Sequence, residues 1–391
     1  MHDLKHDIGQ LLIIGFDATE MSPHVASLLT RIQPAGVILF ARNIAAADQT
    51  HRLLRECQRY VQAPLFTCVD LEGGQVDRFR NVLGPTPSAA DVFATGDRKL
   101  FRKHGRLIGE NCRALGFNVD FAPVLDLAFE ASKTVMGSRA VSANPKDVIA
   151  YAREFLRGLS DARVFGCGKH FPGLGEANLD THLELPSVKK PFKELWEQDL
   201  VPYRLMRREL PMLMVSHAAF SEVTKDKMPA SLSKKWITDI LRKKIAYRGL
   251  IVSDDLEMGG VLAAAPIEHA AIGHFRAGGD LCLICHQEDF VFRAHEALTR
   301  EAERDRRFAR LVQDAARRVL AFKKKHLVVR HAPPPTAARV EKLMRQLWEF
   351  GEEVRAAGLN SAAFNSPALD SATAKNGRRN SAHPRSEERS A

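Results

Sequence analysis

Short apolar runs recur eight times between Leu11 and Cys285, and stretches long enough for helices separate them. In these stretches apolar residues recur at helical spacing, and several begin with Ser, Asp or Pro. Strands that alternate with helices indicate parallel β/α units, and eight units predict a closed (β/α)8 barrel of the TIM type in the α/β class. The predicted strands are residues 11–16, 36–40, 65–70, 117–127, 164–170, 211–217, 249–255 and 280–285, and the predicted helices are residues 46–61, 97–115, 145–160, 191–207, 233–245 and 266–277.

A polar or ionisable residue follows each predicted strand. The carboxyl ends of barrel strands meet at one rim, where the active sites of this fold lie. Any one of these residues could be a helix cap or a surface charge, but eight in register predict an enzyme. In chain order they are Asp17, Arg42 with Asn43, Asp70, Asp126, Lys169 with His170, His217, Asp254 with Asp255, and His286.

The stretch of residues 164–186, VFGCGKHFPGLGEANLDTHLELP, concentrates candidate chemistry. Asp180 and His182 are two residues apart, so in extended backbone both side chains point the same way. A carboxylate beside an imidazole orients the ring and raises its basicity, which is what a general acid/base needs. We therefore predict an acid/base pair in the loop that follows the fifth strand.

The seventh strand ends in two adjacent carboxylates, Asp254 and Asp255, which cannot both point into one cavity from extended backbone. We expect one to react and the other to be a structural partner. A carboxylate nucleophile opposite an acid/base suits glycoside cleavage through a covalent glycosyl-enzyme. The polar groups that a sugar's hydroxyls would need are Asp70, Arg78, Arg139, Lys169 and His170.

Two of the polar residues have a plain structural alternative. Arg78 could simply form an ion pair with Glu72 or Asp77, and His217 could be a hydrogen-bonded residue of the barrel. Neither residue therefore identifies a site by itself.

The positive net charge raises the question of nucleic-acid binding. The net charge is +10, and many basic residues of 292–330 alternate with apolar ones at helical spacing. Without stacking aromatics they predict a solvated helix face rather than nucleic-acid binding.

Targeting signals and cysteines bear on the cell compartment. The apolar run near the start of the sequence is too short for a secretory signal, and no run reaches membrane-span length. Six scattered cysteines suit reduced thiols in a cytoplasm. Cys282 and Cys285 would face opposite sides of a strand, which argues against a redox or zinc pair.

The chain changes character after Arg330. We predict a barrel domain over residues 1–330 and an extension over 331–391, which starts with the Pro-rich linker HAPPPT. Residues 337–357 are predicted to be an amphipathic helix, with Val340, Leu343, Met344 and Leu347 on one face. From Leu359 onward the Ser-, Asn-, Ala- and Arg-rich sequence predicts disorder.

Several motifs occur in one order and at familiar spacing: VDLEGGQVDRFR, NVDFAPVLDL, VMGSRA, KHFPGLG with DTH, MVSHAAF, PASLS and VSDDLEM. Together they resemble family 3 glycoside hydrolases of the NagZ type, the single-domain β-N-acetylhexosaminidases. The resemblance covers about residues 8–285 and does not reach the tail.

The resemblance implies a role for each candidate. Asp254 would be the nucleophile, His182 the acid/base and Asp180 its dyad partner. Asp70, Arg78, Arg139, Lys169 and His170 would bind the terminal N-acetylglucosamine. Such enzymes remove this sugar from muropeptides or related glycans in cell-wall recycling, with retention of configuration and without a metal or organic cofactor. We accordingly expect a cytoplasmic monomer whose partner is a carbohydrate.

Two departures from the family pattern and three alternatives remain. Leu174 stands where the family often has His, which bears on loop conformation or a secondary substrate contact, and Thr181 replaces the usual Ser. The nearest rival is a phosphorylase or glucosidase of the same family. A metal-dependent barrel hydrolase using His170, His182, His217 and Asp254 is a second, and a non-catalytic glycan-binding protein is the third.

Overall fold

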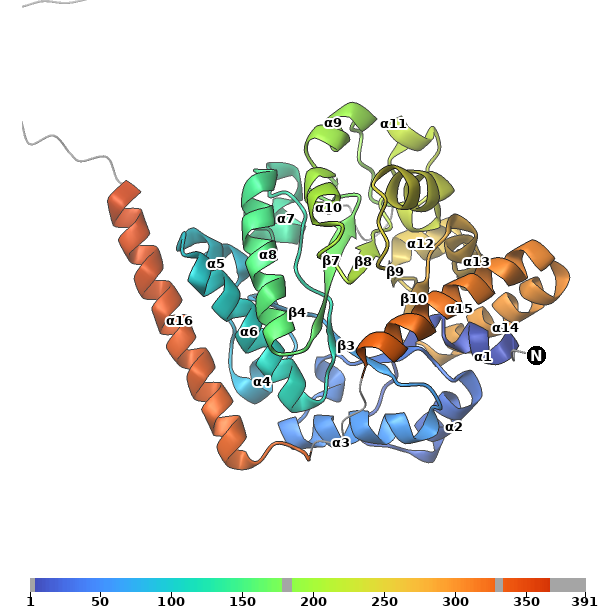
Figure 1. Cartoon of the computed structure of the whole chain (residues 1–391), viewed down its shortest axis with the longest axis horizontal. Coiled ribbons are helices and arrows are strands. Elements are labelled where there is room, and N and C mark those ends of the chain that lie inside the picture. The colour runs from blue at the N-terminus through green and yellow to red at the C-terminus, as the bar shows by residue number, and fades with distance from the viewer. Residues whose placement is uncertain (1–3, 178–184, 328–332, 366–391) are drawn as a thin grey trace, which may run out of the picture.

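The computed structural model describes residues 4–177, 185–327 and 333–365, the last six as helix backbone only. Its centre is a closed parallel barrel in the strand order β1-β10-β9-β8-β7-β6-β3-β2 (Figure 1). The (β/α)8 class is confirmed and all eight predicted strands are present, but the strand predicted over residues 117–127 is too long, since the regular strand there covers only Val119–Asp120. The barrel strands are β1 (Leu12–Ile14), β2 (Gly36–Ile38), β3 (Phe66–Val69), β6 (Val119–Asp120), β7 (Phe165–Phe171), β8 (Met212–Val215), β9 (Leu250–Asp255) and β10 (Leu281–Ile284), while β4 (Leu71–Gly73) and β5 (Val76–Asp77) form a small antiparallel pair.

The strands are apolar on both faces because both are buried. Ile13 belongs to the cluster that fills the barrel, while Leu12 and Ile14 pack with the surrounding helices. Cys282 and Cys285 divide in the same way, as predicted, between the outer and the inner cluster. All six cysteines are buried and free.

Helices surround the barrel, and local signals explain their ends. Helix α6 starts after Asp97, whose side chain accepts the Lys99 N–H, and stops at Gly116, which has a positive φ of 95°. The helices are α1 (Leu4–Gly9), α2 (Pro23–Ile32), η1 (Ala41–Asn43), α3 (Ala47–Cys57), η2 (Gln58–Tyr60), α4 (Arg80–Leu83), α5 (Ala89–Ala94), α6 (Arg98–Leu115), η3 (Glu130–Ser132), α7 (Lys133–Met136), η4 (Gly137–Arg139), α8 (Pro145–Asp161), α9 (Phe192–Glu197), α10 (Val201–Met206), α11 (Ser221–Thr224), η5 (Ala230–Leu232), η6 (Lys235–Lys244), α12 (Gly259–Ala264), α13 (Ile267–Ala277), α14 (Glu288–Arg304), α15 (Arg306–His326) and α16 (Ala337–Asn365).

The helix predicted over residues 191–207 is wrong as one continuous element. The chain forms α9 and α10 instead, with a break around Asp199. The Asp199 carboxylate is buried and lies 2.9 Å from the Lys190 ammonium. This tertiary ion pair interrupts the helix that the sequence periodicity predicts. The segment predicted over 233–245 is helical, but in η6 the turns are of the wider π type.

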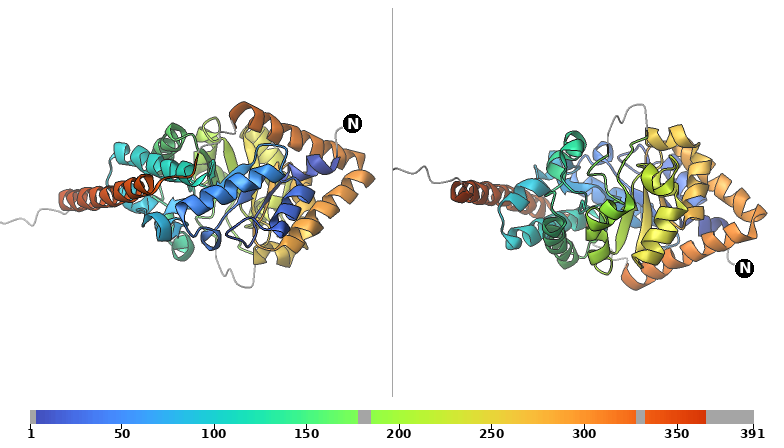
Figure 2. Two further views of the ribbon diagram at one scale, coloured as in Figure 1. Left: turned by 90° about the horizontal axis from the view of Figure 1, so that it is seen from below. Right: turned by 90° about the horizontal axis from the view of Figure 1, so that it is seen from above.

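The basic stretch of residues 292–330 is helical, as predicted, and spans parts of α14 and α15. The N-terminal helix α1 lies against both (Figure 2). One residue departs from the predicted solvated face, because Lys323 is buried beneath the barrel. Its ammonium donates to Gln10 Oε1 at 2.7 Å and lies 5.0 Å from the Phe66 ring centre, and burial lowers its pKa to about 7.

The predicted amphipathic helix of the extension is α16, which packs along α4, α5 and α6 (Figure 1). Its predicted end at residue 357 and the disorder predicted from Leu359 are wrong as far as Asn365, because the helix continues to that residue. Its buried stripe is Leu343, Leu347, Phe350 and Val354. Met344 was predicted for this face but is 44% exposed. The buried residues follow one another at intervals of four, three and four residues, and Met344 lies at the edge of the stripe that they form. Within the described ranges, none of the helices combines the length and the hydropathy of a membrane-spanning segment.

Candidate active site

A cavity of about 360 Å³ opens at the carboxyl ends of β3, β7, β8 and β9. It brings together six of the eight predicted site residues. Asp180 and His182 lie outside the described residues, so the predicted acid/base pair is not placed. The six that line the cavity are Asp70, Arg78, Arg139, Lys169, His170 and Asp254.

Glu72, at the start of the β4–β5 pair, organises the cationic wall of the cavity. Its carboxylate accepts two hydrogen bonds from the Arg139 guanidinium, at 2.7 and 2.8 Å, and lies 2.6 Å from Lys169 Nζ. Burial opposes ionisation, but Lys169 and Arg139 outweigh it and lower the pKa of Glu72 to about 2. Lys169 also donates to Asp70 Oδ1 at 2.8 Å. Two carboxylates and two cations are thus fixed in one buried network.

Asp126 fixes His170, the last polar residue of β7. Its Oδ2 lies 2.7 Å from His170 Nδ1 and accepts the His170 backbone N–H at 3.1 Å. Its Oδ1 accepts the Leu174 N–H at 2.7 Å. Because a carboxylate can only accept, Nδ1 carries a proton, and Nε2 is the nitrogen left for a ligand in the cavity.

Arg78 does not form the ion pair with Glu72 or Asp77 that the sequence left open as a structural alternative. Glu72 bonds Arg139 and Lys169, and the Asp77 carboxylate accepts the Phe79 and Thr86 N–H groups. The guanidinium lies 5.5 Å from the Phe40 ring centre, and among the described residues its buried Nε has no hydrogen-bond partner. This arrangement leaves Arg78 donors for a bound molecule.

Asp254, near the end of β9, is the carboxylate best suited to attack. Its Oδ1 accepts the N–H of Asp255 at 2.8 Å. Burial raises the pKa of a carboxyl, but the neighbouring His170, this N–H and Lys169 reverse the effect and lower the pKa of Asp254 below its usual value. Asp254 is therefore ionised at neutral pH, as a nucleophile must be.

His217 is a hydrogen-bonded residue of the barrel, which is the structural alternative that the sequence left open. Its Nδ1 lies 2.7 Å from Ser231 Oγ, and its Nε2 lies 2.9 Å from the backbone oxygen of Asp255. A carbonyl oxygen accepts only, so Nε2 carries the proton and Nδ1 accepts from the hydroxyl. Burial lowers the pKa of His217, which keeps the ring neutral. With both nitrogens engaged, His217 supports the backbone beside Asp254 and is not free to ligate a metal.

Asp255 is the structural partner of the pair, although it too borders the cavity. Its Oδ1 accepts the Glu257 N–H at 3.1 Å, and its Oδ2 lies 3.5 Å from His286 Nε2. Burial, reinforced by the Glu257 and Asp254 carboxylates, raises the pKa of Asp255 to about 7.

The raised pKa predicts a pH effect on stability. Folded Asp255 keeps its proton up to about pH 7, whereas an unfolded Asp loses it near pH 3.9. The folded state thus binds more protons between these values, and stability falls as pH rises through this window. We expect Asp255→Asn to show a smaller drop in Tm from pH 5 to pH 8 than the wild type. Asp289→Asn, at an exposed position, is the control, and equal drops for Asp255→Asn and the wild type would contradict the assignment.

One group of side chains has metal-ligand spacing: ligand atoms of Asp255, Glu257 and His286 all lie within 4.8 Å of one another. The Glu257 oxygens, however, accept the backbone N–H groups of Cys285, His286 and Gln287. These bonds fix the turn between β10 and α14, so the group is better explained as a structural cap than as a metal centre.

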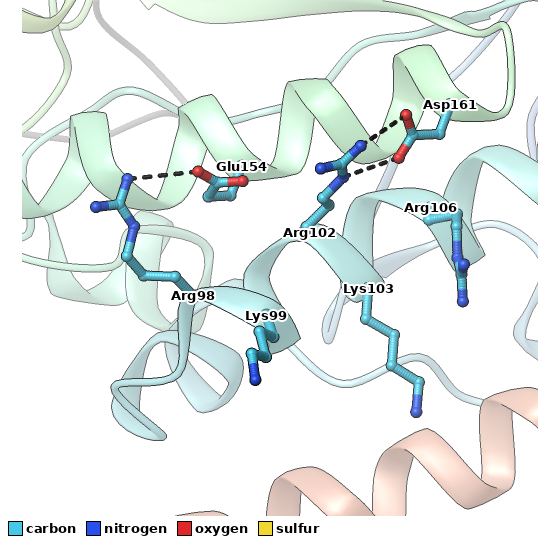
Figure 3. A pocket seen from close by; sticks show the side chains of 7 residues that line it. All are labelled: Arg98, Lys99, Arg102, Lys103, Arg106, Glu154 and Asp161. Carbon is cyan, nitrogen blue, oxygen red and sulfur yellow. Dashed lines mark hydrogen bonds and ion pairs between the residues drawn. The ribbon is translucent and has the colours of Figure 1, made fainter.

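A second hollow, of about 450 Å³, lies on the outer surface of α6 and α8 (Figure 3). Two of its guanidinium groups are engaged by carboxylates of α8: Arg102 forms two hydrogen bonds with Asp161, and Arg98 pairs with Glu154 at 3.4 Å. Lys103 pairs with Glu353 of α16. The hollow is thus a surface groove of ion pairs, and it contains none of the predicted catalytic residues.

Sequence reasoning missed Glu72 as a site residue and named Asp126 only as a strand end. Each acts by holding cavity residues that come from distant parts of the chain. The available signal was a carboxylate within a run that is otherwise apolar or Gly-rich, at the end of a predicted strand. The cavity also has apolar lining. Val135, Pro186 and Met258 were not predicted to line it, whereas Leu174 lies where the sequence indicated loop conformation or a secondary substrate contact.

Comparison with known proteins agrees with this site. The model of the glycosyl hydrolase family 3 N-terminal domain matches residues 3–322. A beta-hexosaminidase of Alkalilimnicola ehrlichii is 35% identical over 287 residues, covering 72% of this chain and 82% of that protein. One of Idiomarina loihiensis is 33% identical over 279 residues, covering 70% and 83%.

Two solved structures are similar over most of the chain. The family 3 beta-N-acetylglucosaminidase of a Paenibacillus species has a TM-score of 0.81 and 30% identity, covering 90% of this chain and 69% of that one. Native NagZ of Neisseria gonorrhoeae has a TM-score of 0.70 and 29% identity, covering 91% and 98%. With the family match over most of the barrel and a cavity of paired carboxylates and cations, the chain belongs to glycosyl hydrolase family 3 and is a glycoside hydrolase.

Proposed function

We propose that the protein is a retaining β-N-acetylhexosaminidase that removes terminal β-linked N-acetylglucosamine from muropeptides or related glycans in cell-wall recycling. The observation that carries the proposal is the cavity itself, which is lined both by ionised Asp254 and by the Asp70, Lys169 and Arg139 network. A cavity of about 360 Å³ is at the small end of ligand sites, which favours one terminal sugar over an internal stretch of glycan. The curated relatives are named beta-hexosaminidases, and the similar Paenibacillus structure is a beta-N-acetylglucosaminidase, which supports this choice of sugar.

In this mechanism some residues carry out the chemistry and the others orient a catalytic group or bind the sugar. Asp254 attacks the anomeric carbon while His182, as imidazolium, gives its proton to the leaving glycosidic oxygen. Neutral His182 then takes a proton from water, whose oxygen displaces Asp254, and two inversions give retention. Asp180 orients the ring, while Asp70, Arg78, Arg139, Lys169 and His170 bind the sugar's hydroxyl and acetamido groups.

The remaining parts of the proposal concern setting and organisation. We propose that the protein acts as a monomer. Six buried, free cysteines suit the reducing cytoplasm. We also propose that residues 1–330 form the catalytic domain and that 331–391 are an extension, of which α16 is packed on the barrel.

The test is release of nitrophenolate from 4-nitrophenyl N-acetyl-β-glucosaminide and from the matching glucoside. Release from the N-acetyl sugar alone is expected. Release from the glucoside alone would keep the family and overturn the substrate, and a sugar 1-phosphate formed only with phosphate present would favour a phosphorylase. Silence of the folded protein on both substrates would favour a glycan-binding protein.

Substitution of Glu72 tests whether its carboxylate orients Arg139 and Lys169 for activity. In Glu72→Gln, Arg139 and Lys169 lose the charge that orients both, so we expect kcat/KM for the N-acetyl substrate to fall about 100-fold. Glu110→Gln breaks only a surface pair with Arg106 at 3.8 Å and should change activity less than about twofold. Equal, small effects of both changes would contradict an organising role for Glu72.

A further inference from the structure

A buried lysine outside the cavity joins three parts of the chain. Lys190 lies near the end of the β7–α9 connection, and its side chain is 3% exposed. Its ammonium lies 2.9 Å from Asp199 Oδ2, 2.8 Å from Gln198 Oε1 and 3.1 Å from Glu176 Oε1. It also lies 4.7 Å from the centre of the Phe129 ring. A lysine loses solvation and rotamer freedom when it is buried, so such a position requires several compensating contacts.

The groups that hold the ammonium also support the chain as it leaves β7. A Cβ added to Gly173, whose φ is +134°, would lie 3.0 Å from the Asp199 Cβ. A Cβ added to Gly175 would lie 2.8 Å from the Phe129 ring. Residues 173–176 therefore pack directly against Asp199 and the Phe129 ring, which both contact Lys190. A residue larger than glycine at position 173 or 175 would not fit.

The contacts of Lys190 link the two ends of the segment that carries the predicted acid/base pair. Glu176 precedes residues 178–184 and Lys190 follows them, so their ion pair connects the two sides. The far side is fixed separately, because Ala219 N donates to the Pro186 oxygen at 2.7 Å and Val188 N donates to the Ala219 oxygen at 2.8 Å. Through its bond to Glu176, the Lys190 side chain ties the near side to this frame.

We propose that Lys190 is a positioning residue for acid catalysis: by tying Glu176 and Asp199 together, it sets the spacing of the two chain ends between which Asp180 and His182 lie. The proposal rests on the function proposed above, in which this pair protonates the leaving oxygen. Lys190 itself does not line the cavity and touches no substrate. Its effect must therefore appear in the step that needs the proton and not in sugar binding.

The experiment compares Lys190→Met with Lys189→Met, since Lys189 is the exposed neighbour of the same type. The substrates are aryl N-acetyl-β-glucosaminides with leaving groups of increasing pKa, together with an unactivated N-acetylglucosamine disaccharide. For Lys190→Met we expect kcat to fall about 100-fold on the disaccharide and less than about fivefold on the dinitrophenyl glycoside, with KM little changed. Lys189→Met should stay within about twofold on every substrate, and Lys190→Arg should recover part of the loss.

A loss of equal size across the series would make Lys190 purely structural and overturn the proposal. If Lys190→Met does not fold, Glu176→Gln replaces it, because this change cuts only the link to a partly exposed carboxylate. A smaller loss with the same leaving-group dependence would support the proposal, and a flat series would overturn it. A flat series for His182→Ala would overturn the acid/base assignment and this proposal with it, so the two failures are distinguishable.

Discussion

Asp254→Ala is expected to lower kcat on 4-nitrophenyl N-acetyl-β-glucosaminide by about 10⁴-fold or more. The activated leaving group needs little protonation, so this substrate isolates the nucleophile. The Asp255 N–H and the neighbouring His170 and Lys169 stabilise the Asp254 carboxylate, and a methyl group in its place offers the anomeric carbon no electron pair. Initial rates of nitrophenolate release measure the effect.

The control for this prediction is Asp255→Asn. It alters the adjacent carboxyl, which bonds Glu257 N, and leaves the reacting oxygens in place. Asp255→Asn should retain activity within about tenfold, because it disturbs only a supporting turn. If the two variants lost activity equally, or if Asp254→Ala remained active, the assignment of the nucleophile to the first Asp of the pair would be wrong.

His182→Ala is expected to separate substrates by their leaving groups. Without a proton donor, an unactivated disaccharide should be turned over about 10³-fold more slowly, within the range that general acid catalysis contributes. The 4-nitrophenyl glycoside, whose leaving group is stable as an anion, should lose far less in its first step. Measuring kcat/KM on both substrates tests this, because that ratio reports the steps up to release of the leaving group.

Two comparisons sharpen the result for His182. Asp180→Asn keeps the ring but removes the charge that favours the imidazolium, so it should produce the same substrate dependence at a smaller size. Added azide should restore turnover of the activated substrate by His182→Ala, since a small anion needs no base to attack the glycosyl-enzyme. Equal losses on both substrates would contradict the acid role of His182.

The sequence predicted the barrel well because its strands are buried on both faces and therefore appear as continuous apolar runs between amphipathic helices. It also predicted the residues at the cavity, since parallel strands bring their carboxyl ends to one rim. The roles of Asp254, the sugar-binding residues and the dyad residues Asp180 and His182 came from the motifs of the family, and all of them remain predictions.

Other features depend on tertiary partners that local patterns do not contain. Glu72 is charged and buried only because Arg139 and Lys169 arrive from η4 and β7. The break between α9 and α10 follows from the pairing of Asp199 with Lys190, although the sequence there has helical periodicity. Lys323 was counted with a solvated face, yet Gln10, from the opposite end of the barrel domain, gives it a buried acceptor.

The closure of the barrel between β1 and β10 has a consequence for protein synthesis. In the finished molecule Ile13 pairs with Gly36 of β2 on one side and with Leu283 of β10 on the other. A ribosome makes the first strand long before the last one, and until β10 emerges one edge of β1 lacks its hydrogen-bonding neighbour. Open strand edges in nascent chains favour association between molecules. We therefore expect the nascent chain to be most prone to association before β10 emerges, and this edge of β1 to be protected once the two strands pair.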